Sequence, residues 1–178
     1  TLYPRFMEST VTLSQMTLTE GEFTVTDLTI NSASATSVRA NSNSIRNTSA
    51  PEGAVVIPDT MVASDGVAYP VTSITTTLTK DGGVSELYIG NNVESIPANF
   101  AGVTADDYTN TLYNTMLMKV YLGKGLKEIP DYAFAGCYNL TGVIEIPYGV
   151  TKVGDYAFSD SKKITGFVIS ETVQELGD

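Results

Sequence analysis

The sequence predicts a mostly β solenoid with short helical turns, preceded by a β-rich N-terminal cap. Two observations indicate this fold class. The word Asp-Tyr-Ala-Phe occurs at residues 131–134 and again at 155–158, and the apolar residues upstream of both copies keep the same spacing. A pattern that returns at a fixed period of about 20–50 residues is typical of stacked supersecondary units rather than of a single globular core.

Four segments align on one apolar pattern. Each has an apolar-x-apolar triplet, then single apolar residues four and seven positions later, then Pro or Gly. Successive steps from Val93 are 33, 24 and 23 residues, so the unit is 23 or 24 residues long with an insertion in the first copy. An aromatic residue follows in three of them, at Phe100, Phe134 and Phe158. The aligned triplets are Leu87/Ile89, Val120/Leu122, Ile144/Ile146 and Phe167/Ile169.

The spacing within one unit predicts its local structure. The triplet is a short strand with one buried face. Asp131 and Asp155 are expected to cap a single helical turn that carries Tyr-Ala-Phe inward, and Gly136 offers a left-handed stop. Stacking of the units would place their strands side by side in parallel and turn the three phenylalanines into one continuous core.

The N-terminal third has a different pattern. Residues 10–30 predict two strands around a Gly-containing turn, and residues 31–53 predict a loop with one strand near residues 37–39. Asp65-Gly66, between alternating apolar residues, predicts a second hairpin. We expect this region to cover the apolar end of the first coil.

Two stretches of the sequence resemble a known family. Residues 126–170 read LKEIPDYAFAGCYNLTGVIEIPYGVTKVGDYAFSDSKKITGFVIS, and residues 84–102 read VSELYIGNNVESIPANFAG. They are similar to the BspA-like leucine-rich repeats of bacterial cell-surface proteins. The resemblance implies a right-handed leucine-rich-repeat solenoid with parallel strands over residues 53–178, after a cap or extension at 1–52. Its repeats would be a degenerate one at 53–83 and further ones from about 84, 117, 141 and 165.

Composition restricts the class of partner. The net charge of −10 and a pI near 4.3 oppose binding to nucleic acid. No stretch of the chain is long and apolar enough to be a membrane span. Few charged residues with many Thr, Ser and Asn suit an extracellular surface, and the resemblance implies a location outside the cell or on the outer surface of a bacterium.

The residue types argue against an enzyme. The chain has no histidine, which removes imidazole-based nucleophile systems and metal sites, and Cys137 lies in an apolar context typical of a buried structural thiol. Ser159 to Lys162 matches Ser-x-x-Lys but falls in a loop. Asp81, Asp106 and Asp107 lack the spacing of a calcium site, so a structural calcium stays a weak alternative. We expect no catalytic residue, no cofactor and no metal.

The remaining candidate for a functional site is an exposed face of the strands. Residues between the buried strand positions must point away from the core, which places a ladder of side chains on one exposed face. From the sequence alone we favour a structural role, in which paired tyrosines stabilise the sheet. The alternative is a partner-binding face, since tyrosine combines apolar area with a hydroxyl. The residues of this face are Glu86, Tyr88, Lys119, Tyr121, Glu145 and Val168.

The expected function is non-enzymatic binding of extracellular or host macromolecules, because members of the resembled family are associated with attachment to extracellular proteins and with co-aggregation. A carbohydrate-binding or accessory module of a glycan-utilisation system is one alternative, and a passive spacer is another. The sequence ends in VQELGD, where the next Tyr-Ala-Phe should come. Either the chain is a fragment or its exposed end pairs with something.

Overall fold

A computed structural model describes residues 11–12, 24–29, 32–37, 54–57, 59–62, 68–74, 78, 84–102 and 116–178. The described elements are strands joined by turns, with no helix among them. Accordingly, the described part of the chain holds no helix that is long and apolar enough to cross a membrane.

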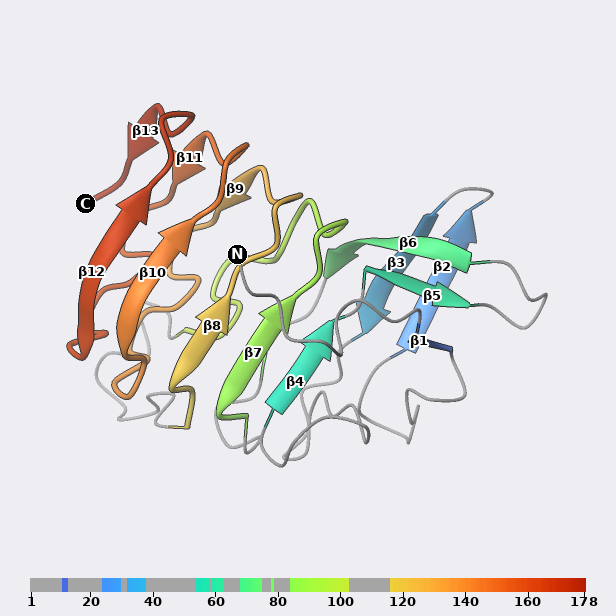
Figure 1. The fold of residues 1–178 in the computed structure, drawn as a ribbon, viewed down its shortest axis with the longest axis horizontal. Coiled ribbons are helices and arrows are strands. Elements are labelled where there is room, and N and C mark those ends of the chain that lie inside the picture. The colour runs from blue at the N-terminus through green and yellow to red at the C-terminus, as the bar shows by residue number, and fades with distance from the viewer. Residues whose placement is uncertain are drawn as a thin grey trace.

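The main feature is a row of parallel strands, one from each coil (Figure 1). Three of them form one hydrogen-bonded sheet and the last two form another, with matching residues side by side: Leu87 pairs with Val120, and Ile144 with Phe167. The two sheets meet where the Thr141 amide donates to the Met118 carbonyl at 3.0 Å. The five strands are β4 (Ala54–Ile57), β7 (Glu86–Ile89), β8 (Lys119–Tyr121), β10 (Gly142–Ile146) and β12 (Ile164–Ile169).

A second column of short parallel strands runs along another side of the coils: β9 (Glu128–Ile129), β11 (Lys152–Val153) and β13 (Glu175–Leu176). Each of these strands contains the apolar residue seven positions after the triplet: Ile129, Val153 or Leu176. The parallel, mostly β solenoid expected from the period is thereby confirmed.

The phenylalanine column is confirmed as well. Phe100 and Phe134 have no solvent exposure, and Phe158 packs against the same core. The Phe134 ring lies edge-on to Phe100 at a centroid distance of 6.3 Å and stacks on Phe158 at 5.3 Å. Aliphatic residues of the strands fill the space around the rings, so the core continues from coil to coil.

The turn that carries Tyr-Ala-Phe differs from the expected helical cap. Residues 131–136 form successive tight turns, and Tyr132 has a φ of 55° while Gly136, as predicted, has 69°. The turns bond to one another between coils, since the amides of Phe134 and Gly136 each donate at 2.7 Å to carbonyls of the following coil. Each turn is therefore held by its neighbour as well as by bonds of its own, such as those from the Ala133 amide to the Pro130 carbonyl and from the Ala135 amide to the Tyr132 carbonyl, both at 3.2 Å.

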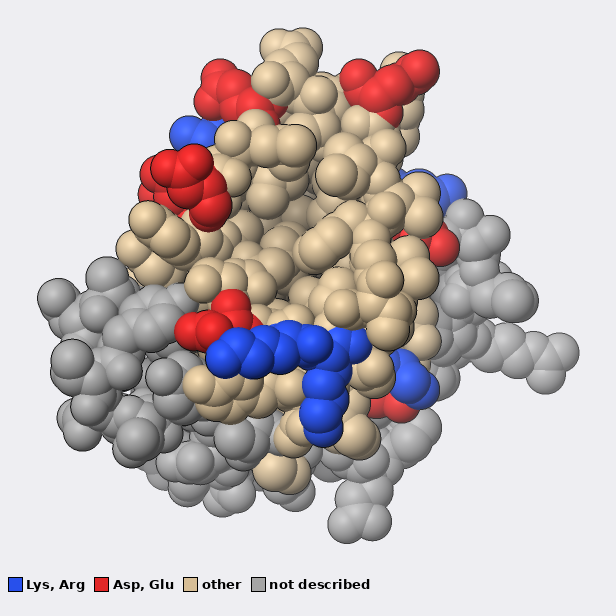
Figure 2. All heavy atoms as spheres, turned by 90° about the vertical axis from the view of Figure 1, so that its left-hand side faces the viewer, with Lys and Arg blue, Asp and Glu red and all other residues tan. Residues whose placement is uncertain are grey.

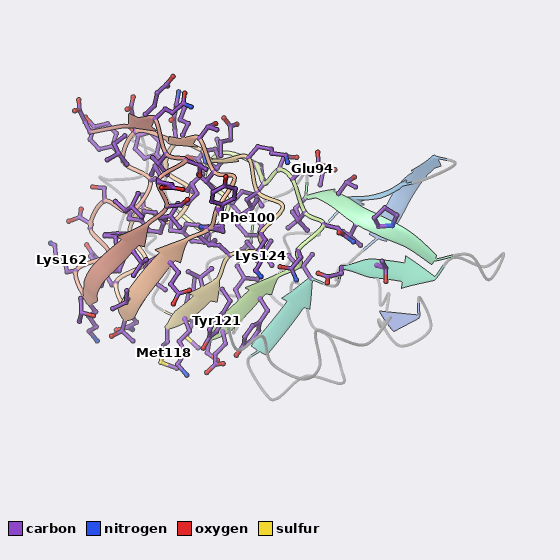
Figure 3. The ribbon with its side chains drawn as sticks, turned by 45° about the horizontal axis from the view of Figure 1, so that its top comes forward. Glu94, Phe100, Met118, Tyr121, Lys124 and Lys162 are labelled. Carbon is purple, nitrogen blue, oxygen red and sulfur yellow. The ribbon has the colours of Figure 1, made fainter. Side chains whose placement is uncertain are left out.

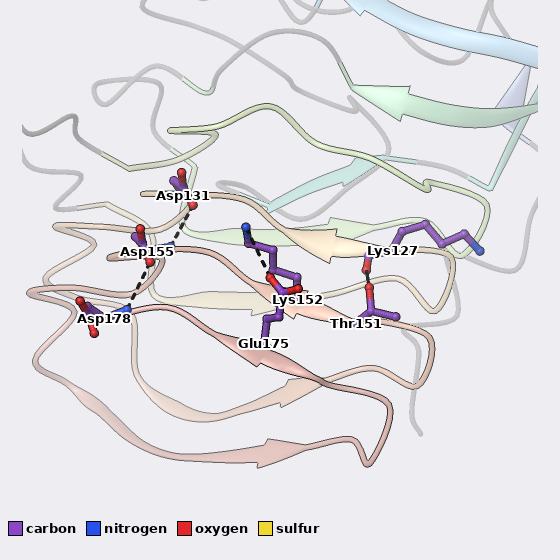
Figure 4. A network of polar contacts seen from close by, with 7 residues as sticks. All are labelled: Lys127, Asp131, Thr151, Lys152, Asp155, Glu175 and Asp178. Atoms are coloured by element: carbon purple, nitrogen blue, oxygen red, sulfur yellow. Dashed lines mark hydrogen bonds and ion pairs between the residues drawn. The ribbon is translucent and has the colours of Figure 1, made fainter.

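The capping role expected for Asp131 and Asp155 is wrong in its partner. The Asp131 carboxylate accepts the amide of Asp155 at 2.9 Å, and the Asp155 carboxylate accepts that of Asp178 at 3.4 Å (Figure 4). Both carboxylates thus reach forward to the next coil. Asp131 therefore has the spacing of a local helix cap, but its carboxylate bonds to the next repeat.

The N-terminal strands form a separate five-stranded sheet in the order β1-β5-β6-β3-β2. The hairpin expected within residues 10–30 is wrong, because β1 pairs with β5 and β2 pairs with β3. The hairpin around Asp65-Gly66 is confirmed by the antiparallel pairing of β5 with β6, although its turn lies outside the described residues. The bounds are β1 (Val11–Thr12), β2 (Thr24–Thr29), β3 (Ser32–Ser37), β5 (Thr60–Val62) and β6 (Ala68–Ile74).

The five-stranded sheet joins the coils through the end of β6. The Ile74 amide donates to the Ser95 carbonyl at 3.0 Å, and the Glu94 amide donates to the Thr72 carbonyl at 2.8 Å. The strand expected near residues 37–39 lies at Ser32–Ser37. The division into 1–52 and 53–178 stays a prediction, since β4 joins the coil array while β5 and β6 join the other sheet.

The last coil departs from the expected burial. Phe167 and Ile169, which the period places inward, are 45% and 48% exposed, and Leu176 is also exposed. Their counterparts in the preceding coil, Ile144 and Ile146, are buried. The difference arises because a coil buries its flat face only against a neighbour, and none of the described residues stacks beyond β12 and β13.

Candidate binding face

Four of the six residues expected on the exposed ladder lie together on β7 and β8. Tyr88 pairs with Tyr121, and Glu86 pairs with Lys119, in the parallel register of the two strands. Side chains alternate along a strand, so these four point away from the phenylalanine core. Tyr121 is accordingly seen on the side of the strands away from Phe100 (Figure 3).

The four side chains form a bonded cluster, here called the tyrosine cluster. The rings of Tyr88 and Tyr121 stack with centroids 4.4 Å apart and planes 5° apart. The Glu86 carboxylate accepts the Tyr88 hydroxyl at 2.7 Å and the Lys119 ammonium at 2.9 Å. The carboxylate thereby orients both neighbours.

Exposure within the tyrosine cluster corrects the sequence expectation. Tyr88 was expected on the surface but is only 5% exposed, whereas Tyr121 is 37% exposed. Strand alternation sets the direction of a side chain and not what covers it, and the stacked Tyr121 ring covers one face of Tyr88. Tyr121 and Lys119 are therefore the residues of this cluster that a partner can reach.

Glu145 and Val168 lie one and two strands further along, paired with each other across β10 and β12. Both are exposed, and both line a hollow of about 340 Å³. Tyr148 and Lys124 also line this hollow and were not predicted, because they lie in the turns after the strands, where side chains do not alternate between two faces. The lining is completed by Leu122, Lys124, Ile146, Pro147 and Tyr148.

The electrostatics of the tyrosine cluster follow from its hydrogen bonds. The bond from Tyr88 and, next, the bond from Lys119 lower the pKa of the Glu86 carboxyl. Burial, together with the bond to Glu86, raises the pKa of the Tyr88 hydroxyl, and the bond to Glu86 raises the pKa of Lys119. At neutral pH the cluster consequently holds an ionised carboxylate, a neutral tyrosine and a charged lysine.

The Tyr88→Phe variant is expected to raise the pKa of Glu86 toward its ordinary value of 4.5, because the Tyr88 hydroxyl is the largest cause of its lowering. Carbon-detected NMR titration of the carboxyl groups measures this change. Tyr148→Phe serves as the control and should leave the Glu86 titration unchanged.

The same shift sets a pH window for stability. The pKa of Glu86 is lower in the folded chain than in the unfolded chain, so Glu86 stabilises the fold above about pH 4.5 and this contribution is lost as pH falls through the lowered value.

Identical Glu86 titrations in the parent chain and in Tyr88→Phe would contradict the hydrogen bond from the Tyr88 hydroxyl to the Glu86 carboxylate.

The residues considered for chemistry lie apart from this face. Cys137 is buried, its thiol donates to the Ala101 carbonyl at 3.4 Å, and burial raises its pKa. Lys162, of the Ser-x-x-Lys match, forms an ion pair with Asp160 at 3.1 Å. Among the described residues no group of three or more His, Cys, Asp or Glu side chains is placed to hold a metal. Asp81, Asp106 and Asp107 lie outside the described residues.

A column of parallel strands built from units of 23 or 24 residues is typical of leucine-rich repeats. Residues 107–178 match the family model described as the BspA type leucine rich repeat region (6 copies). Residues 107–178 therefore match BspA-type leucine-rich repeats, as the resemblance of the sequence implied. The sequence matches no curated protein.

Solved structures show the same fold at low sequence identity. A leucine-rich repeat protein from Bacteroides capillosus is 21% identical with a TM-score of 0.63, and the match covers 86% of this chain and 97% of that one. A pneumococcal vaccine antigen, PcpA, is 20% identical with a TM-score of 0.55, covering 85% of this chain and 36% of that one. A Treponema pallidum leucine-rich repeat protein is 17% identical with a TM-score of 0.52, covering 87% and 78%.

Proposed function

We propose that this chain is a non-enzymatic, extracellular or cell-surface repeat protein that binds an extracellular or host protein through the outward face of β7, β8, β10 and β12. The observation that carries the proposal is the set of exposed aliphatic and aromatic side chains on that face, among its charged residues. Val143 and Val168 point outward and are more than half exposed, beside the exposed rings of Tyr121 and Tyr148. A merely solvated strand face carries polar residues at such positions.

The composition of the face favours a protein partner. Buried aromatic residues carry much of the energy at protein interfaces, and exposed aliphatic side chains add apolar area. Tyr121 is held in place by its stack on Tyr88, so little side-chain freedom is lost on binding. A glycan would instead use open ring faces and hydrogen-bonding groups, and valines contribute neither. The proposed extracellular or cell-surface location of the chain is supported by the resemblance of its repeats to those of bacterial cell-surface proteins.

The test is surface plasmon resonance in two panels. In the first, the purified chain flows over immobilised extracellular-matrix proteins, fibronectin among them. In the second, soluble glycans flow over the immobilised chain. We expect binding to a protein ligand, weakened about tenfold or more in Tyr121→Ala and in Tyr148→Ala. Glu128→Ala changes an exposed residue in the second strand column and should bind like the parent chain.

Two results would contradict the proposal and separate its rivals. Binding to glycans alone would favour a carbohydrate-binding module, whereas no binding in either panel would favour a passive spacer. Equal loss of binding in Glu128→Ala and Tyr121→Ala would place the interface elsewhere on the coils.

A further inference from the structure

The hollow at the ends of β8, β10 and β12 combines charged groups, an aromatic ring and apolar surface. Its volume is about 340 Å³. Tyr148 is 70% exposed at its margin, and Lys124 and Glu145 are exposed as well. Leu122 and Ile146, which are otherwise buried, add apolar lining. A hollow of this composition suits a side chain that is apolar along its length and charged at its tip.

The turn that carries Tyr148 is fixed by bonds within and between coils. The Val150 amide donates to the Pro147 carbonyl at 3.3 Å, and Gly149 between them has a φ of 106°, a value that favours glycine. The Gly149 amide also donates to the Thr172 hydroxyl of the next coil at 3.0 Å. The backbone that carries the ring is therefore in place before a ligand binds, which lowers the entropy cost of binding.

The Glu145 carboxylate is available to a ligand. Within the described part of the chain it forms no ion pair, whereas the Glu86 carboxylate pairs with Lys119 at 2.9 Å. Lys124 lines the same hollow without pairing with Glu145. An exposed carboxylate beside an open tyrosine ring binds cationic groups, because it offers a charge-assisted hydrogen bond and the ring offers a cation–π contact.

The lysines that precede β12 lie away from the hollow. Figure 2 faces β12 and β13, and its largest group of Lys and Arg side chains lies low, at the start of β12, whereas the hollow lies where the strands end. The Lys162 ammonium pairs with Asp160 at 3.1 Å and lies over the Tyr138 ring at 5.8 Å. Lys163 donates to the Asn139 side-chain oxygen at 2.6 Å. Neither ammonium group offsets the charge of the carboxylate in the hollow.

We propose that the hollow binds an arginine side chain of the protein partner, with the guanidinium on the Glu145 carboxylate and against the Tyr148 ring. The inference rests on the proposed function, because it names the group of the partner that this face recognises. The methylene stem of the arginine packs on the apolar lining, and arginine is one of the residues that contribute most to binding at protein interfaces. The net charge of −10 also attracts a basic partner.

Two other charged side chains fit the hollow less well. A lysine ammonium is a point charge, whereas the planar guanidinium of arginine donates two hydrogen bonds to one carboxylate and stacks on a ring. A carboxylate ligand would reach Lys124, but it would lie close to Glu145 and would approach a chain of net charge −10. We therefore expect arginine to bind more tightly than either.

The test is NMR titration of the isotopically labelled chain with Nα-acetyl-arginine methylamide and with the matching lysine, glutamate and citrulline compounds. Citrulline has the shape of arginine without its charge. We expect the arginine compound to shift the signals of the Tyr148 ring and the Glu145 carboxyl group, and to bind about tenfold more tightly than the citrulline compound. Glu145→Gln should weaken its binding about tenfold and Tyr148→Ala about fivefold.

Glu128→Gln changes an exposed carboxylate of the second strand column and is the matched control, which should bind the arginine compound like the parent chain. Equal affinity for the arginine and citrulline compounds, tighter binding of the lysine or glutamate compound, or no shift at the hollow would overturn the inference.

The two proposals can fail separately. A protein ligand that Glu145→Gln binds as tightly as the parent chain does would overturn the arginine site and leave the proposed function standing. Arginine binding in the hollow without any protein ligand in the surface plasmon resonance panel would support the site and count against the proposed function.

Discussion

Replacing Phe134 by alanine is expected to lower the free energy of unfolding by about 3–5 kcal/mol. The ring has no solvent exposure and contacts both neighbouring rings of the column, Phe100 edge-on and Phe158 face-on. Its removal leaves a cavity between rigid coils that are bonded through their backbones on either side, so the site cannot collapse to fill it. Urea unfolding followed by circular dichroism measures the loss.

Tyr156→Ala is the matched control for the aromatic column. Tyr156 also stacks on its counterpart one coil earlier, Tyr132, at 5.2 Å, but it lies on the surface. Its loss should cost less than about 1.5 kcal/mol, the usual size of an exposed aromatic pair. A cost below about 1 kcal/mol for Phe134→Ala would mean that the ring is not a core residue.

Replacing Gly154 by alanine is expected to lower the free energy of unfolding by about 1–3 kcal/mol. A Cβ atom at this position would lie 2.6 Å from the Asp131 amide nitrogen and 2.8 Å from the Pro130 carbonyl carbon, and it would also meet the Asp131 carboxylate. These are groups of the preceding coil, so the added methyl group would force two coils apart. Thermal and urea unfolding both report the effect.

Gly166→Ala provides the comparison for this backbone contact. At Gly166 the nearest atom to an added Cβ is a methyl group of Val143, 4.0 Å away. This variant should lie within about 0.5 kcal/mol of the parent chain. Equal effects of the two substitutions would show that the coils do not approach each other closely at Gly154.

The repeat was predictable from the sequence because each coil packs against its neighbours in the same way, so equivalent positions must be apolar in every coil. The apolar triplets at Leu87/Ile89 and Val120/Leu122 keep one phase because their strands lie in register, and that phase is visible in the sequence. The phenylalanine column follows for the same reason. What the period could not show is where a polar group bonds, since Asp131 has the spacing of a local cap and yet bonds to the next coil.

The N-terminal pairing and the details of the face were harder to predict. β1 pairs in parallel with β5, some fifty residues away, and no local turn signal marks such a partner. Tyr88 points outward as alternation predicts, but its burial depends on a ring contributed by another coil. Tyr148 and Lys124 reach the face from turns, and only the folded positions of the turns bring them to the hollow beside Glu145.

The stacking of successive coils through their phenylalanines is tested most directly by nuclear Overhauser contacts between the aromatic rings in phenylalanine-labelled protein. The structure predicts contacts from Phe134 to both Phe100 and Phe158, at centroid distances of 6.3 and 5.3 Å. Phe100 and Phe158, which lie two coils apart, should give none with each other. A spectrum in which the Phe134 ring contacts neither of them would contradict the stacked-coil structure and, with it, the binding face built on its strands.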